Sequence, residues 1–137
     1  MNPSHCPPIA PSAACPCGRG RPYGACCGPL HAGAAAASAL ALMRSRYSAY
    51  ARGEADYLRA SWHASTRPTE LELEAPGVVR WLGLEVKRHV EQDADHALVE
   101  FVARYRVGGA RAVRLHETSR FVREDGRWYY VDGDVHA

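Results

Sequence analysis

Residues 81–132 read WLGLEVKRHVEQDADHALVEFVARYRVGGARAVRLHETSRFVREDGRWYYVD, and this stretch decides the fold class. Apolar and polar residues alternate through it, a period of two that is typical of β-strands with one buried face. Three short polar or glycine-rich segments, at 92–95, 108–109 and 124–126, have the length and composition of hairpin turns. They divide the stretch into predicted strands over 81–91, 97–107, 112–123 and 128–132. Consecutive strands joined by short turns predict an antiparallel meander.

The segment before the strands has a helical period instead. Leu40, Met43, Tyr47 and Tyr50 recur at steps of three and four, which predicts an amphipathic helix over 35–52. Arg46 lies off this stripe, and Gly53 is suited to ending the helix. Further helical segments are predicted over 54–62 and, as a single short turn, over 69–74. Helices followed by an antiparallel sheet predict the α+β class.

Four of the five cysteines, Cys15, Cys17, Cys26 and Cys27, lie within 13 residues. The first residues contain no Lys or Arg and make a poor secretory signal, so a reducing compartment that disfavours disulfides is expected. Four thiolates can surround one zinc ion tetrahedrally and leave no open position, which predicts one structural zinc per chain. A [2Fe–2S] cluster and free thiols are the alternatives. Cys6 stands apart in a proline-rich tail and is expected to be a free, exposed thiol.

The cysteine-rich segment resembles a known motif. Residues 15–28, CPCGRGRPYGACCG, are similar throughout to the SEC-C motif, the zinc-binding tail module of the SecA preprotein translocase. Cys27 stands where the translocase usually has His. The segments LMRSRYSAYARGEADYLRASWH, WLGLEVKRH, VEFVARYR and HETSRFVREDGRWYYVDG resemble the YchJ-like proteins, in which a SEC-C motif precedes an NTF2-like domain. Many of those proteins end in a second SEC-C motif, which this sequence does not contain, so a function that needs two such motifs is not expected.

The resemblance implies a domain organisation and a cavity. A flexible proline-rich tail is expected over 1–14, a SEC-C module and linker over 15–33, and an NTF2-like domain over 34–137. In such a domain a curved four-stranded antiparallel sheet folds over the helices and encloses a cone-shaped cavity.

Glu117 is the anomaly in the row of side chains expected to face that cavity. It shares one strand face with the apolar Leu115 and Phe121, so it is either a cavity acid or base, or a structural group paired across the sheet. Trp62, His63 and Trp81 lie near the transition from helices to sheet, where NTF2-like cavities open, although core and sheet packing is the simplest role for the tryptophans. No Ser-His-Asp order, phosphate-binding loop or open metal triad occurs, so no catalytic residue is assigned and an enzyme is not expected.

The charge distribution bears on partners. The 137 residues carry a formal charge of +2, but no acidic residue precedes Glu54, so the first 53 residues carry +5 and the remainder −3. A basic head on a mildly acidic body indicates an acidic partner for the head. The resemblance to the SEC-C and YchJ-like proteins implies a cytoplasmic zinc-binding adaptor whose SEC-C head docks a protein partner, ribosome- or secretion-associated. A small-molecule binder or cofactor-free enzyme that uses the NTF2-like cavity is the main alternative. RNA or ribosome contact through the basic head is a third. No membrane span is expected, and NTF2-like domains often form homodimers through the sheet.

Overall fold

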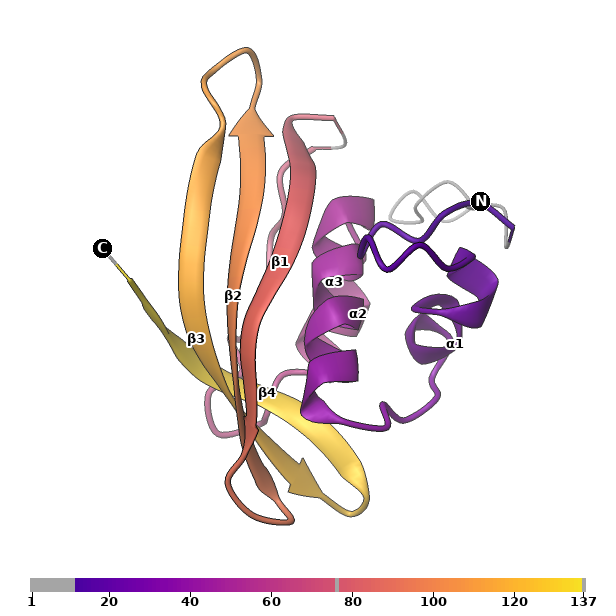
Figure 1. Cartoon of the computed structure of the whole chain (residues 1–137), viewed down its shortest axis with the longest axis vertical. Coiled ribbons are helices and arrows are strands. Elements are labelled where there is room, and N and C mark those ends of the chain that lie inside the picture. The colour runs from indigo at the N-terminus through magenta and orange to yellow at the C-terminus, as the bar shows by residue number, and fades with distance from the viewer. Residues whose placement is uncertain (1–11, 76, 137) are drawn as a thin grey trace.

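The computed structural model describes residues 12–75 and 77–136, so Cys6 and most of the proline-rich tail lie outside the described residues. The described chain has the predicted α+β class, with helices first and a four-stranded antiparallel sheet after them (Figure 1). The helices are η1 (Tyr23–Ala25), α1 (Gly28–His31), α2 (Ala39–Arg52) and α3 (Ala55–Ala60). The strands are β1 (Val79–Glu91), β2 (His96–Val107), β3 (Val113–Glu124) and β4 (Arg127–Val135), paired in the order β1-β2-β3-β4.

Helix α2 begins and ends where local chemistry places it. The Ser38 hydroxyl accepts the backbone N–H of Ala41 at 3.1 Å, which caps the first turn. Gly53 ends the helix, as predicted. The start at Ala39 rather than at residue 35 follows from this cap, because the alanines that precede Ser38 offer no side-chain acceptor for the free N–H groups.

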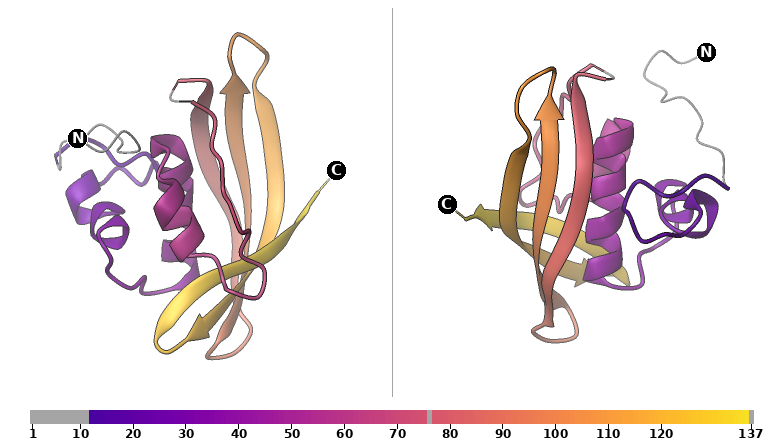
Figure 2. Two further views of the ribbon diagram at one scale, coloured as in Figure 1. Left: turned by 180° about the vertical axis from the view of Figure 1, so that it is seen from behind. Right: turned by 45° about the horizontal axis from the view of Figure 1, so that its top comes forward.

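Helix α2 lies between two layers, the concave face of the sheet on one side and the segment around α1 on the other (Figures 1 and 2). Its buried residues therefore run around most of the helix rather than along one stripe: Ala39, Leu42, Met43, Ser45, Arg46, Tyr47, Ser48 and Ala49. The expectation that Arg46 lies off the buried face is wrong. Its side chain is covered because α3 and the sheet close over it.

The helical turn predicted over 69–74 is also wrong, since the chain is extended there. Leu71 and Leu73 are half-buried, while Glu70, Glu72 and Glu74 are exposed. This alternation has the period of an extended chain that rests on a surface. A helix would also have placed the like charges of Glu70 and Glu74 one turn apart, which is destabilising.

The sheet buries its concave face against α2. In β2, Ala97, Val99 and Ala103 are almost fully buried, and Phe121 of β3 joins them with Met43 and Trp128. The predicted alternation in β2 and β3 is therefore confirmed. Strand β4 continues to Val135, beyond the predicted end at residue 132, after a register shift opposite Arg120 and Phe121. No described helix is long and apolar enough to cross a membrane.

Candidate metal centre

The four predicted cysteines come together at one point. The Sγ atoms of Cys15, Cys17, Cys26 and Cys27 all lie within 4.8 Å of one another, and none forms a disulfide. Cys15, Cys17 and Cys27 are buried, and Cys26 is half-buried. The loop that links the two pairs needs glycine, because Gly18 and Gly20 have φ angles of 79° and 76°.

The spacing of the sulfur atoms fits a tetrahedral metal ion. A tetrahedron with metal–sulfur bonds of about 2.3 Å has sulfur–sulfur edges of about 3.8 Å. The Sγ atoms of Cys17 and Cys26 are 3.5 Å apart, and those of Cys26 and Cys27 are 4.0 Å apart. Four protein thiols at these distances could hold one metal ion and would fill its tetrahedral coordination shell, which leaves no position for a substrate.

The protonation of the thiols also favours a cation at the centre. A hydrogen bond from Cys27 lowers the pKa of Cys17 to about 5. The same hydrogen bond, together with burial, raises the pKa of Cys27, and burial raises that of Cys26 to about 11. The surroundings of the cluster therefore stabilise the thiolate form of Cys17 and the protonated thiol forms of Cys26 and Cys27. Full ionisation of the cluster requires a bound cation.

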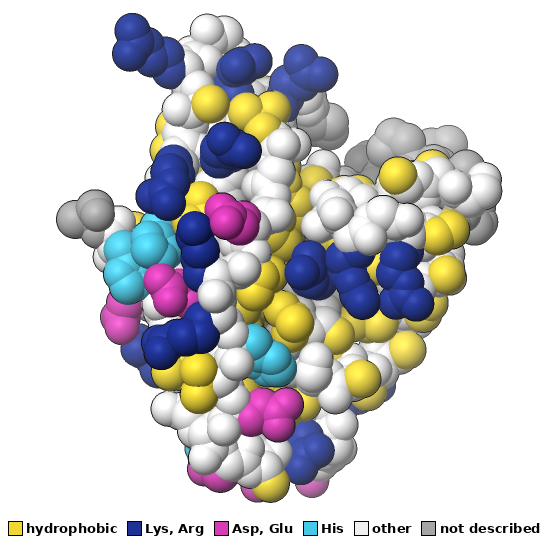
Figure 3. Space-filling view, viewed as in Figure 1, with side chains coloured by type: hydrophobic (Ala, Val, Ile, Leu, Met, Phe, Trp, Pro, Cys, Tyr) yellow, Lys and Arg dark blue, Asp and Glu magenta, His cyan; other side chains and the backbone are white. Residues whose placement is uncertain are grey.

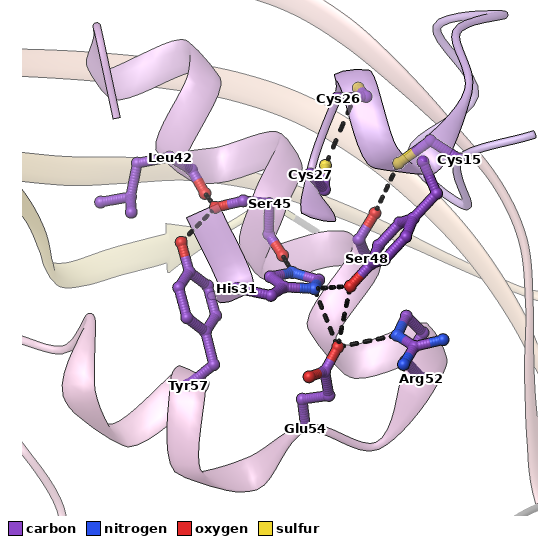
Figure 4. A network of polar contacts seen from close by, with 11 residues as sticks. Cys15, Cys26, Cys27, His31, Leu42, Ser45, Ser48, Arg52, Glu54 and Tyr57 are labelled. Carbon is purple, nitrogen blue, oxygen red and sulfur yellow. Dashed lines mark hydrogen bonds and ion pairs between the residues drawn. The ribbon is translucent and has the colours of Figure 1, made fainter. Parts of the chain in front are cut away.

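The cysteine cluster is built into the core of the protein. Three of the cysteines pack in one apolar cluster with Tyr47 of α2 and Ala103 of β2. The Sγ of Cys15 lies 3.4 Å from the hydroxyl oxygen of Ser48, also on α2 (Figure 4). The SEC-C segment and the sheet thus share α2 as a common layer.

A second contact between the SEC-C segment and the helices centres on His31, which sequence reasoning did not single out. Its Nε2 lies 2.8 Å from the carbonyl oxygen of Ser45, and its Nδ1 lies 2.8 Å from Glu54 Oε2 (Figure 4). Tyr23 Oη is 2.6 Å from the same Nδ1, and Arg52 Nε donates to Glu54 at 2.7 Å. The hydrogen bond from His31, helped by Arg52, lowers the pKa of Glu54 to about 2.

Glu117 lies on the concave face of the sheet, where the alternation predicted it. The hydroxyl of Ser119 donates to its Oε2 at 2.5 Å, and that of Tyr130 lies 3.5 Å away. The carboxylate packs against Gly133 of β4. A methyl group added at Gly133 would come within 2.8 Å of Glu117 Cδ. Glu117 is therefore held in place by its own strand and by the neighbouring strand.

The structure brings one other cavity candidate close to Glu117. Trp62 packs edge-on against the same Tyr130, with ring centroids 5.0 Å apart. The buried guanidinium of Arg46 lies over both rings and donates to the carbonyl oxygen of Leu58 at 2.8 Å. Nothing in the sequence pattern distinguished Arg46 from Arg44 and Arg52 of the same helix, which are only half-buried.

The other two candidates lie elsewhere. Trp81 belongs to an aromatic group with Tyr47, Tyr50 and Tyr105. The Nε2 of His63 lies 2.9 Å from Glu124 at the β3–β4 turn.

Two further features lie outside the cysteine cluster. A hollow of about 730 Å³ separates the segment over 30–36 from α3 and the start of β4. On the opposite face of the sheet, possible ligand atoms of Glu100, His116 and His136 lie within 4.8 Å of one another. There His116 Nε2 already contacts Glu100 at 2.6 Å, and His136 Nε2 lies 2.8 Å from Thr118.

Fold and site together define a class: an α+β protein with an N-terminal SEC-C cysteine knuckle and an NTF2-like body. Family comparison agrees, with the SEC-C motif matched over residues 12–29 and the description "YchJ, middle NTF2-like domain" over residues 38–133. The chain belongs to the YchJ family.

Similar proteins carry names without an assigned activity. The chain is 62% identical over 141 residues to the UPF0225 protein RSc0270 of Ralstonia nicotianae, covering 94% of this chain and 96% of the relative. It is 60% identical over 125 residues to a UPF0225 protein of Xanthomonas campestris, covering 91% and 97%. The solution structure of RPA3114, a SEC-C motif containing protein from Rhodopseudomonas palustris, matches with a TM-score of 0.77 and 36% identity, covering 91% of this chain and all of that one.

Proposed function

We propose that this protein is a cytoplasmic zinc-binding adaptor, in which the SEC-C knuckle presents a basic loop to an acidic protein partner. The observation that carries the proposal is the asymmetry of the knuckle. Its cysteines are turned inward against α2, while the loop between them, residues 18–22, is exposed along its whole length. A metal site without an open position serves to hold that loop in shape.

Zinc is the ion that suits this ligand set best. It has no geometric preference of its own, accepts four thiolates in a tetrahedron and needs no redox partner. A tetrathiolate zinc centre carries a charge of −2, which Arg19 and Arg21 of the loop partly balance. A reducing cytoplasm would keep the cysteines available as thiolates.

The loop supplies the side chains for docking. Arg19 and Arg21 are both exposed and both lie in it. Arginine forms bidentate hydrogen bonds with carboxylates, so an acidic protein surface is the matching partner. Identification of the captured protein would show whether this partner is ribosome- or secretion-associated.

The test replaces Arg19 and Arg21 by Glu in the zinc-loaded full chain. Deletion of residues 1–33 is unsuitable, because the cysteines form part of the core. In an affinity pull-down, the double variant should lose the proteins that the wild type retains, while it keeps one equivalent of zinc. Recovery of the same proteins by both forms would refute docking through the loop.

A second candidate function is binding of a small ligand beside Trp62, at the end of α3. The observation in its favour is the Trp62 indole Nε1, which is buried without a hydrogen-bond partner among the described residues. Such a donor is rare and would be satisfied by a ligand oxygen. Trp62→Phe, which keeps the ring but removes the N–H, should abolish stabilisation by a ligand found in a thermal-shift screen. Unchanged stabilisation would exclude Trp62 from the site.

A further inference from the structure

The face of the sheet that points away from α2 carries an arginine cluster that neither the metal site nor the core explains. We call Arg80, Arg104, Arg106 and Arg114 the arginine face. Alternation places them opposite the buried row of Val99 and Ala103, and three of the four are exposed, Arg106 being half-buried. Lys and Arg side chains gather over this end of the sheet, near the β2–β3 turn (Figure 3).

The strand register sets these arginines directly against one another. Arg80 of β1 pairs with Arg106 of β2, and Arg104 of β2 pairs with Arg114 of β3. Like charges directly opposite each other in a sheet are destabilising. The arrangement therefore costs stability in the free protein, and a bound anion would remove that cost.

Neighbouring arginines show what ordinary pairing looks like in this sheet. Arg120 bonds Asp132 and Asp134, and Arg123 lies 3.3 Å from Asp95. In contrast, within residues 12–75 and 77–136 no carboxylate lies within 4.0 Å of a nitrogen atom of the arginine face. The nearby Glu85 is itself exposed and contacts Lys87 at 3.2 Å.

A hollow lies between the arginines. It has a volume of about 230 Å³ and is lined by Gly83, Leu84, Glu85, Val102, Arg104 and Arg114. Gly83 creates the space, because nothing lies within 4 Å of the position that its side chain would occupy. Two guanidinium groups thus border a recess with room for an oxyanion such as a phosphate group.

We propose that the arginine face binds the phosphodiester backbone of single-stranded nucleic acid. Several cations in a row match a chain of phosphates, and guanidinium groups bind phosphate bidentately. The residues that alternate onto this face in β1, β2 and β3 include no Phe, Tyr or Trp side chain for base stacking, and the ring of His116 is already stacked on that of His136, so recognition is through the backbone and is independent of sequence. A second copy of this chain is disfavoured as the occupant, because two arginine faces would repel each other.

Binding is measured by fluorescence anisotropy with a labelled 20-nucleotide oligouridylate and the zinc-loaded full chain, over a series of salt concentrations. Four neutralised phosphates predict a slope of log K against log[salt] of about −3. Arg104→Gln with Arg114→Gln should halve the slope to about −1.5 and weaken binding at low salt at least tenfold. The same variant should melt at an equal or higher temperature, because a like-charge pair is removed.

The matched control is Arg120→Gln with Arg123→Gln, which removes the same charge from paired arginines and should leave the slope near −3. An equal loss in both variants would reduce the effect to net charge and overturn the proposal. Absence of binding at 50 mM salt would also overturn it. So would tighter binding of polyglutamate than of the oligonucleotide, which would assign the face to an acidic protein. Oligothymidylate should bind within about threefold of oligouridylate, and a tenfold preference for either would contradict backbone recognition.

Discussion

Replacement of Gly133 by Ala tests whether Glu117 is held as the structure shows it. An added methyl group would come within 2.8 Å of Glu117 Cδ and 3.1 Å of its Cγ, and closer still to Oε2. The carboxylate must therefore move away from β4. Because the Ser119 hydroxyl donates to that same Oε2, the movement breaks a hydrogen bond to a charged group.

The magnitude follows from two opposing contributions. A hydrogen bond to a charged group contributes about 1.5–3 kcal/mol. Alanine in place of glycine restricts the unfolded chain and returns about 0.4–1 kcal/mol, since Gly133 does not have a positive φ angle. The expected net destabilisation is about 1–2 kcal/mol, or a fall in Tm of roughly 3–8 °C for a chain of this size.

Urea unfolding of the wild type, Gly133→Ala, Glu117→Ala and the double variant forms a complete cycle. With the carboxylate removed, Gly133→Ala should become neutral or slightly stabilising, which gives a coupling of about 1.5–3 kcal/mol, the contribution of the lost hydrogen bond. Gly83→Ala is the matched strand control, because nothing lies within 4 Å of its added methyl group, and it should change stability by less than about 0.5 kcal/mol. A neutral Gly133→Ala variant, or the same cost in the Glu117→Ala background, would refute the placement of Glu117.

The remaining predictions concern the metal centre, Arg46 and Glu54. Cys26→Ser should lose the metal and lower Tm, because the cysteines share a core with α2, whereas Cys6→Ser should keep one equivalent of zinc by elemental analysis; zinc retained by Cys26→Ser would exclude the four-cysteine site. Arg46→Met should destabilise by about 2–4 kcal/mol in urea, because the buried Ser61 hydroxyl and the Leu58 carbonyl group lose a charged donor; a cost below about 1 kcal/mol would contradict this role. The depressed pKa of Glu54 adds stability to the folded protein that is present above about pH 4.5 and is lost as pH falls toward 2. The Glu54→Gln variant should lack this contribution, so the difference in unfolding free energy between wild type and variant should shrink between pH 5 and pH 3. With an ordinary pKa for Glu54, this difference would stay constant over that range.

The sequence by itself determined the parts that depend on near neighbours along the chain. The period of two over 81–132 and three short turns were enough for the four strands, their antiparallel order and the inward position of Glu117. The spacing of Cys15, Cys17, Cys26 and Cys27 was enough for the cluster, because a knuckle of 13 residues closes on itself. The helical turn predicted over 69–74 failed because the local sequence signal there was weak. Helix propensity does not show that Leu71 and Leu73 rest on a surface in an extended chain.

Only the tertiary structure decided what lies against what. The periodicity of α2 indicated one apolar stripe, but the knuckle covers a second side of this helix, which places Ser48 beside Cys15 from 33 residues away. Arg46 is buried because α3 and β4, which come later in the chain, enclose it. The opposition of Arg104 and Arg114 likewise depends on strand register, which a slip of a single residue would have changed. A sequence pattern specifies which face of an element is apolar or charged, whereas long-range packing specifies how many faces are covered and which charges meet.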